Sequence, residues 1–150
     1  RGITVWLKGN RVSRNQIMAI KEESVTDQKN SLTVCLDNIL RHAGITRNTE
    51  YDLAQGKTAI QILEENMTGV QVLDLSGCSL DAVLYYVNQD IPVLAILEDG
   101  EAVLVTGFNE FNVVIMEPST GKLYKKGMND ATAWFAENGN HFITYMRTEN

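Results

Sequence analysis

The chain has 150 residues, of which 44% are hydrophobic and 21% are charged, and its formal net charge is -6. These values are typical of one soluble globular domain that buries a core without disulfides or metals. The acidic balance argues against a nucleic-acid partner, because phosphate binding needs concentrated Lys and Arg, and no apolar run approaches the roughly 18 residues of a membrane span. Residue 1 is arginine and a strand pattern begins at residue 3, so we expect residues 1–150 to be one domain of a longer protein.

The first 30 residues are predicted to form a strand, a short helix and a loop. Residues 3–8 alternate between apolar and polar side chains, which is the period of a half-buried strand. Ser13 and Gln16 have the spacing of a capping box, which predicts a helix through about Glu23. The polar stretch 24–30 has no periodicity and is predicted to be a loop.

The strongest helix signal follows this loop. Apolar residues recur at i, i+3, i+4, i+7, i+8 and i+11 from Leu32 to Ala43, which is the pattern of a helix with one buried face. Ser31 stands where an N-cap is expected, and Gly44 stands where the helix should stop. Cys35 belongs to the apolar stripe, so we expect its thiol to lie in the core.

Three further elements are predicted before residue 91. Thr58 and Gln61 form a second capping box, which opens a helix to about Asn66. A strand over 70–75 leads into a Ser-Gly-Cys-Ser turn that contains Cys78. The helix after this turn is predicted to end near residue 88, and its inward-facing residues are Leu80, Val83, Leu84 and Val87.

The densest strand signal lies in residues 91–127, which contain four short apolar runs joined by short loops. Such strands must be antiparallel, because a parallel return needs a dozen or more residues. The expected strands are 91–97, 101–107, 112–117 and 121–124. Asn129 or Asp130 is the predicted cap of a last helix, and a strand over 141–146 follows it. Helices followed by a mostly antiparallel sheet indicate an α+β domain.

The helix after Ser31 and the strands after Ile91 together resemble the bacteriocin-processing (double-glycine) cysteine peptidases. That family has a papain-like fold, so the resemblance implies a central helix packed on an antiparallel sheet. The family's nucleophilic cysteine opens the central helix in a Cys-Gly-Pro-Ala-Ala-Leu run, and the helix closes on an aromatic pair and a glycine. Counting back from Gly44 places Ser31 at the cysteine position, with Leu-Thr-Val-Cys-Leu after it.

The same resemblance supplies the other site positions. The family's catalytic histidine begins a strand that ends in Gly-Tyr-Asp, and the matching stretch EAVLVTGFN places Glu101 at the histidine. The family's Asp-Pro pair, whose aspartate orients that histidine, corresponds to Glu117-Pro118, and Gln28 is the nearest candidate for its oxyanion glutamine. All three positions of the triad therefore carry a different residue, and the resemblance implies the fold with a degenerate triad.

These substitutions argue against ordinary cysteine peptidase chemistry. A papain-like site needs a thiolate that a helix N-terminus and an imidazolium stabilise, whereas Ser31 is an alcohol that needs a base. A glutamate at position 101 is too weak a base for an alcohol at neutral pH unless burial raises its pKa. The candidates for a displaced active site are Cys78, which precedes a helix N-terminus, and the Glu101/Glu117 pair, which is either an acid/base couple or two solvent-facing carboxylates.

Three classes of function follow from these observations. We favour a catalytically inactive domain that binds an extended peptide or unfolded protein segment; the alternatives are an active hydrolase with displaced residues and a purely structural module of a larger surface protein. Cys35 and Cys78 match neither a zinc spacing nor a disulfide framework, and the sequence predicts no metal or cofactor. Related degenerate domains occur on peptide exporters, so the resemblance implies binding of an unfolded or extended substrate. The sequence leaves the location open, with an extracytoplasmic site and attachment to a membrane protein as the two alternatives, and this segment itself predicts no membrane contact.

Overall fold

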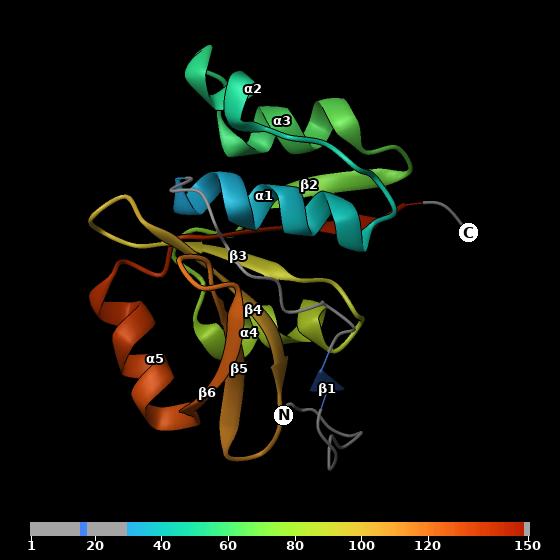
Figure 1. The fold of residues 1–150 in the computed structure, drawn as a ribbon. Coiled ribbons are helices and arrows are strands. Elements are labelled where there is room, and N and C mark those ends of the chain that lie inside the picture. The colour runs from blue at the N-terminus through green and yellow to red at the C-terminus, as the bar shows by residue number, and fades with distance from the viewer. Residues whose placement is uncertain (1–15, 18–29, 149–150) are drawn as a thin grey trace.

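The structure, a computed structural model, describes residues 16–17 and 30–148 (Figure 1). Its helices are α1 (Ser31–His42), α2 (Glu50–Ala54), α3 (Ala59–Asn66), α4 (Leu80–Val87) and α5 (Met128–Glu137). Its strands are β1 (Gln16–Ile17), β2 (Val70–Asp74), β3 (Val93–Ile96), β4 (Ala102–Phe108), β5 (Asn112–Glu117), β6 (Lys122–Gly127) and β7 (Phe142–Arg147). Within these residues, no helix has the length and hydropathy of a membrane span.

Among the described residues, all strand pairs are antiparallel and belong to one sheet, whose order is β2-β7-β3-β4-β5-β6, with β1 paired to β4 outside this order. Strands β3 to β6 are neighbours in both sequence and space, as the short connecting loops predicted. Strand β7 returns from the end of the chain and lies between β2 and β3. Helices combined with an antiparallel sheet confirm the predicted α+β class.

Helices cover both faces of this sheet (Figure 1). One core cluster joins α1 and α3 to the face that includes Leu94, Leu104 and Met116. The other joins α4 and α5 to the opposite face, which includes Val105 and Ile115. Because successive residues of a strand point to opposite faces, β4 contributes to both clusters and is buried along its whole length.

The best-predicted elements are those with both an apolar stripe and local caps. Thr58 and Gln61 form the complete capping box of α3, with reciprocal hydrogen bonds of 3.1 and 2.9 Å. The side chain of Ser79 caps α4 by accepting a hydrogen bond from the Ala82 N–H group at 3.2 Å. Gly44 has φ +88, the left-handed conformation that favours glycine after a helix.

The helix predicted to open at Ser13 is wrong where the structure describes it. Gln16 and Ile17 form strand β1, which pairs with Phe108 and Gly107 of β4. β3 pairs with β4 only as far as Val105, so the last residues of β4 have no β3 partner, and β1 pairs with them. A capping-box spacing reflects only residues that are close in the sequence, whereas β1 forms because its backbone pairs with β4, which is distant in the sequence. The predicted strand over 3–8 and the rest of the predicted helix lie outside the described residues.

Two smaller differences concern helix ends. The N-cap of α5 is Gly127 rather than Asn129 or Asp130, and no side chain caps this helix. Helix α2 was not predicted, because its five residues contain no apolar periodicity and only Asp52 is buried.

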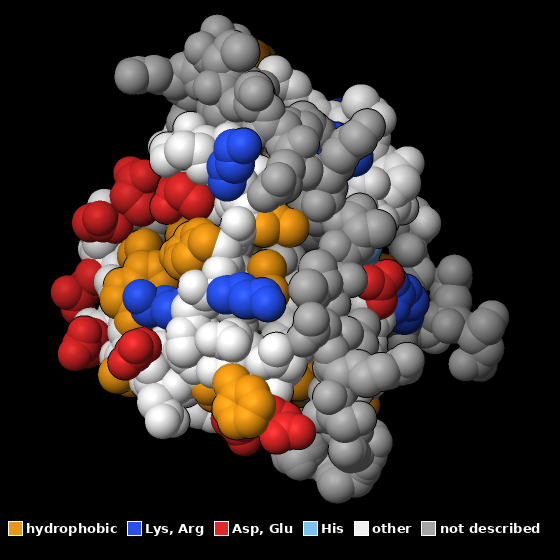
Figure 2. All heavy atoms as spheres, turned by 60° about the horizontal axis from the view of Figure 1, so that its bottom comes forward, with side chains coloured by type: hydrophobic (Ala, Val, Ile, Leu, Met, Phe, Trp, Pro, Cys, Tyr) orange, Lys and Arg blue, Asp and Glu red, His pale blue; other side chains and the backbone are white. Residues whose placement is uncertain are grey.

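Figure 2 views the end of the molecule far from α2 and α3, where acidic side chains gather along one margin and basic side chains flank an apolar patch.

Candidate functional site

Ser31 is the first residue of α1 and not its cap, so the sequence prediction was wrong by one residue. The N-cap is Asn30, whose side-chain oxygen accepts a hydrogen bond from the Leu32 N–H group at 2.7 Å. Asn and Ser are both strong N-caps, and the sequence places them side by side. Because Asn30 caps the helix, the Ser31 hydroxyl is available for a tertiary contact.

That contact is with the beginning of β4. The Ser31 Oγ atom accepts a hydrogen bond from the Ala102 N–H group at 2.8 Å, and the pair is buried. The register pairs Leu104 with Met116, so Ala102 is level with Pro118, where β5 has already ended. The Ala102 N–H group therefore needs an acceptor from another element, and Ser31 supplies it.

The two glutamates that the resemblance singles out, Glu101 and Glu117, lie at the adjoining ends of β4 and β5. Glu101 immediately precedes Ala102, is exposed, and lies in a turn in which its N–H group donates to Asp99 Oδ1 at 2.9 Å. Glu117 is the last residue of β5, is half-buried, and accepts a hydrogen bond from the Ser119 N–H group on Oε1 at 3.0 Å. Glu101 thus directly precedes β4 and Glu117 ends β5; the Glu101 backbone and the Glu117 carboxylate each make a local turn contact.

Cys35 lies one turn after Ser31 and is completely buried. Burial raises the pKa of the Cys35 thiol well above its ordinary value, and the negative charge of Glu117 raises it further. A thiol in this state is protonated at neutral pH and is a poor nucleophile. The expectation of a core cysteine is therefore confirmed.

Among the described residues, no hydrogen bond joins Ser31 to the remaining cysteine or to either histidine. The backbone of His141 does lie at the same end of the sheet as Ala102, because its carbonyl accepts from the Ile96 N–H group and Ile96 pairs with Ala102. His42 ends α1 and contacts the loop after α4, with its Nε2 atom 3.1 Å from the Asp90 carbonyl oxygen. Cys78 is half-buried against the α4–α5 core, in a turn whose Gly77 N–H group donates to the Asn140 carbonyl at 2.9 Å. This bond joins the turn that contains Cys78 to the loop that contains Asn140 and His141, a connection that the sequence did not predict. The side chains of Cys78 and His141 are both described, and no hydrogen bond joins them.

The oxyanion candidate Gln28 lies outside the described residues. Within the described ranges, no group of three or more His, Cys, Asp or Glu side chains is arranged to hold a metal ion.

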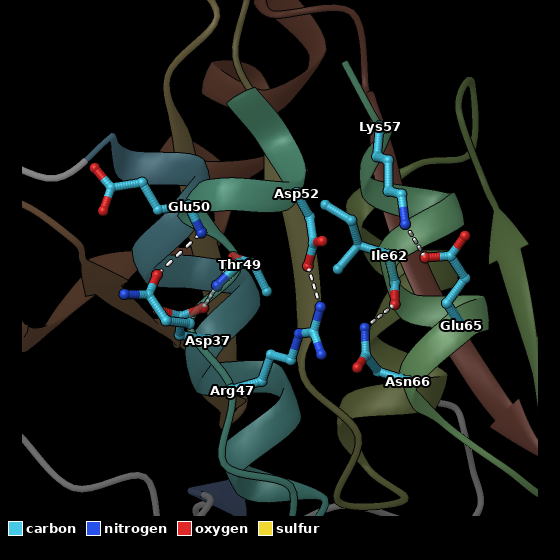
Figure 3. Close-up of polar contacts among 10 residues, drawn as sticks. Asp37, Arg47, Thr49, Glu50, Asp52, Lys57, Ile62, Glu65 and Asn66 are labelled. Atoms are coloured by element: carbon cyan, nitrogen blue, oxygen red, sulfur yellow. Dashed lines mark hydrogen bonds and ion pairs between the residues drawn. The ribbon is translucent and has the colours of Figure 1, made fainter. Parts of the chain in front are cut away.

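A polar layer that the sequence did not predict holds α1 on its outer side (Figure 3). Asp37 is 7% exposed, and its Oδ1 atom accepts hydrogen bonds from both the N–H group and the hydroxyl of Thr49, each at 2.8 Å. Asp52 of α2 is 4% exposed and accepts a hydrogen bond from Arg47 at 2.8 Å. An isolated Asp in a helix gives no sequence sign of burial, because its partner Thr49 belongs to another segment. α1 is therefore held on two sides, by the sheet and by this layer.

Replacing Ser31 with alanine should lower the free energy of unfolding by about 1–3 kcal/mol, because the Ala102 N–H group would be buried without an acceptor. Urea denaturation of the two proteins measures the difference. Ser119→Ala is the matched control: Ser119 is exposed, and its variant should change stability by less than about 0.5 kcal/mol. Equal effects of the two variants would contradict the structural role of the Ser31 hydroxyl.

Comparison with known proteins gives a fold and no sequence family. No family model matches the chain, and no curated protein matches its sequence significantly. Among solved structures, the chain is similar to a protein from Bacillus anthracis described as a "putative C39-like peptidase", with a TM-score of 0.71. The match covers 89% of this chain and 98% of that protein, at 14% sequence identity.

The chain has a C39-like peptidase fold. At 14% identity the likeness concerns the backbone arrangement and carries no catalytic residue from one protein to the other. It confirms the peptidase-like fold that the resemblance predicted. Two points stay predictions: the papain-like packing of the central helix on the sheet, and the assignment of Ser31, Glu101 and Glu117 to the triad positions.

Proposed function

We propose that this chain is a catalytically inactive, papain-like peptidase-like domain that binds an extended peptide or unfolded protein segment. The degenerate triad of the proposal consists of Ser31, Glu101 and Glu117. The observation that carries it is the 2.8 Å hydrogen bond from the Ala102 N–H group to the Ser31 hydroxyl, at the helix start where the family places its nucleophile.

The surroundings of the Ser31 hydroxyl support the proposal that the domain has no peptidase activity. The Ser31 oxygen is buried and already accepts a hydrogen bond, so it is a structural acceptor rather than an exposed nucleophile. Activating an alcohol requires a nearby base that takes its proton. Glu101 is exposed to water, where a carboxylate is far too weak a base for this purpose. The nearest thiol, Cys35, is buried and protonated.

The peptide-binding part of the proposal rests on the fold. Binding an extended chain requires a shaped surface and backbone hydrogen bonds, and it does not require a thiolate. A domain with a peptidase fold can therefore keep its affinity for peptides after it loses the triad. The partner in this proposal is a peptide or unfolded segment, and no cofactor is involved.

The proposal predicts binding of an unfolded chain without cleavage. Fluorescein-labelled casein should show a saturable rise in anisotropy with added protein, and no new fragments should form at neutral pH.

Iodoacetamide should modify Cys35 only slowly, with a rate that rises with pH because the pKa of its buried thiol is raised. Cys78, which is half-buried, should react faster than Cys35.

A paired variant tests the degenerate triad directly. Ser31→Cys with Glu101→His should produce a thiol that reacts with iodoacetamide at least tenfold faster than Cys35, because a helix N-terminus and an imidazole both favour the thiolate. Ser31→Cys alone is the matched control. Rapid modification of Cys78 in the wild-type protein that also abolishes casein cleavage would instead establish the active hydrolase. Absence of both binding and cleavage would favour the structural module.

A further inference from the structure

Strand β2 forms one edge of the sheet, and β7 is its strand partner among the described residues. Gly69 and Leu75 flank this pairing and make backbone hydrogen bonds of 2.9 and 2.8 Å, with Thr148 and Phe142 as their partners. In an antiparallel pair, every second residue directs both its N–H and its C=O group to the neighbouring strand. The odd-numbered residues from 69 to 75 therefore face β7.

The alternate residues Val70, Val72 and Asp74 consequently turn their N–H and C=O groups away from β7. No described residue makes a hydrogen bond to these backbone groups. All three residues are half-buried or exposed, so the outer side of β2 is accessible to solvent. β2 thus presents alternating donors and acceptors along its edge, and the complement of this pattern is another extended backbone.

The two edges of the sheet differ in their protection against such pairing. The opposite edge strand, β6, carries Lys122, Lys125 and Lys126, and lysine side chains on an edge strand oppose the addition of a further strand. Strand β2 has the sequence Val-Gln-Val-Leu-Asp, which contains neither lysine nor proline, and its apolar residues are only half-buried. The β2 edge is therefore the less protected of the two.

The one charged side chain of β2 indicates which peptide would fit. Asp74 is exposed and makes no ion pair among the described residues. Its Oδ1 atom accepts hydrogen bonds from the hydroxyl and the N–H group of Ser76, at 2.6 and 3.0 Å, and these bonds lower the pKa of the Asp74 carboxyl. Because opposite charges on paired strands stabilise the pair, a basic residue is favoured opposite Asp74.

Helix α3 favours a single peptide strand over a second copy of the chain. Figure 1 shows α3 above β2, on which it packs. Two copies paired through β2 would place both α3 helices on the same face of the joined sheet. The two strands would be about 4.8 Å apart, which is closer than the roughly 8–10 Å between packed helices. A peptide brings no helix and avoids this conflict.

We propose that the β2 edge binds an extended peptide as an additional strand, with apolar residues opposite Val70 and Val72 and a basic residue opposite Asp74. This inference rests on the proposed function and assigns its binding surface. The backbone supplies the affinity, and the side chains on the α3 side supply the preference. Strands β7 and β3 lie between β2 and β4, so this surface is separate from the Ser31 hydroxyl.

The probe is the amidated peptide Ser-Lys-Thr-Val-Thr-Val-Ser with an N-terminal fluorescein, whose anisotropy should rise saturably with added full chain. In the antiparallel orientation its lysine opposes Asp74, and its valines oppose Val72 and Val70. N-methylation of both valines removes the amide donors that face β2 and should weaken binding at least tenfold. N-methylation of both threonines is the matched control, because those amides point away from β2, and should weaken binding less than threefold. Equal losses for the two peptides would overturn the proposal.

Val72→Pro removes a donor from the protein side. The Val72 N–H group does not bond to β7, so a proline is compatible with this edge and should weaken peptide binding at least tenfold. Val72→Thr is the matched control, because it keeps the N–H group and the β-branched shape, and should change the affinity less than threefold. Unchanged affinity in a Val72→Pro protein whose circular dichroism matches the wild type would contradict the assignment.

Fluorescein-labelled casein separates this assignment from the proposed function. Equal affinity of the wild-type and Val72→Pro proteins for casein would leave the proposed function standing and overturn the β2 assignment, whereas binding of neither casein nor the peptide would overturn both. A dimer in sedimentation equilibrium that Val72→Pro abolishes would assign the edge to a second copy. Peptide binding that Val5→Asp makes more than threefold tighter would assign it to residues 3–8 of the chain itself, and either result would overturn the peptide assignment.

Discussion

Replacing Ile39 with aspartate should destabilise the protein by several kcal/mol, about 4 or more. Ile39 is 1% exposed and lies in the middle of α1, within the core that α1 shares with α3 and the sheet. An aspartate there would lose the burial of an isoleucine side chain and would place a carboxylate where it has no partner. Effects of this size are exceptional for a single substitution and are diagnostic of a buried site.

Circular dichroism during thermal and urea unfolding measures this loss. Ile39→Val is the matched control, because it removes a single methylene group and should cost about 0.5–1.5 kcal/mol. We expect the valine variant to unfold cooperatively close to the wild-type protein and the aspartate variant to be largely unfolded at room temperature. A stable Ile39→Asp protein would show that α1 does not form the centre of the domain.

Replacing Asp37 with alanine should cost about 2–3 kcal/mol. The change removes the acceptor of two 2.8 Å hydrogen bonds and leaves the Thr49 N–H group buried without a partner. The loss is smaller than that expected for Ile39→Asp, because the variant no longer has to bury a carboxylate. We also expect amide hydrogen exchange to accelerate in residues 45–57 more than in the sheet, because this contact holds that segment to α1.

Two matched variants separate the hydrogen bonds from the charge. Asp37→Asn keeps an oxygen acceptor in the same place and should cost clearly less than Asp37→Ala. Glu65→Gln removes one partner of the exposed 2.6 Å pair between Lys57 and Glu65, and exposed pairs contribute at most about 1 kcal/mol. If Asp37→Ala were as mild as Glu65→Gln, the outer polar layer would not hold α1.

The candidate site was only partly accessible to sequence reasoning. The resemblance directed attention to Ser31 and Glu101, and the structure places the Ser31 hydroxyl against Ala102, the residue after Glu101. The bond itself was not predicted, because it depends on β5 ending at Glu117, one residue short of the position level with Ala102, which leaves the Ala102 N–H group without a strand partner. The connection between the Cys78 turn and the loop before β7 was also missed, because it is a backbone bond between residues 63 positions apart, Gly77 and Asn140.

The sequence by itself determined the elements whose signals are local. Helices α3 and α4 follow from apolar spacing and from caps that lie within three residues of their partners. The antiparallel order of β3 to β6 follows from loops too short for any other connection. In α1, the apolar stripe predicted the buried core face, but the choice of Asn30 over Ser31 as cap was undetermined, since both residues can perform that role.

Only the tertiary structure decided the features that depend on distant partners. β1 is a strand because β4 extends past the end of its pairing with β3, and β7 lies between β2 and β3 because its backbone pairs with both. Asp37 is buried because Thr49 supplies two donors from another segment. The physical reason is the same in each case: a buried polar or backbone group must be satisfied, and its partner is fixed by the packing of the whole chain.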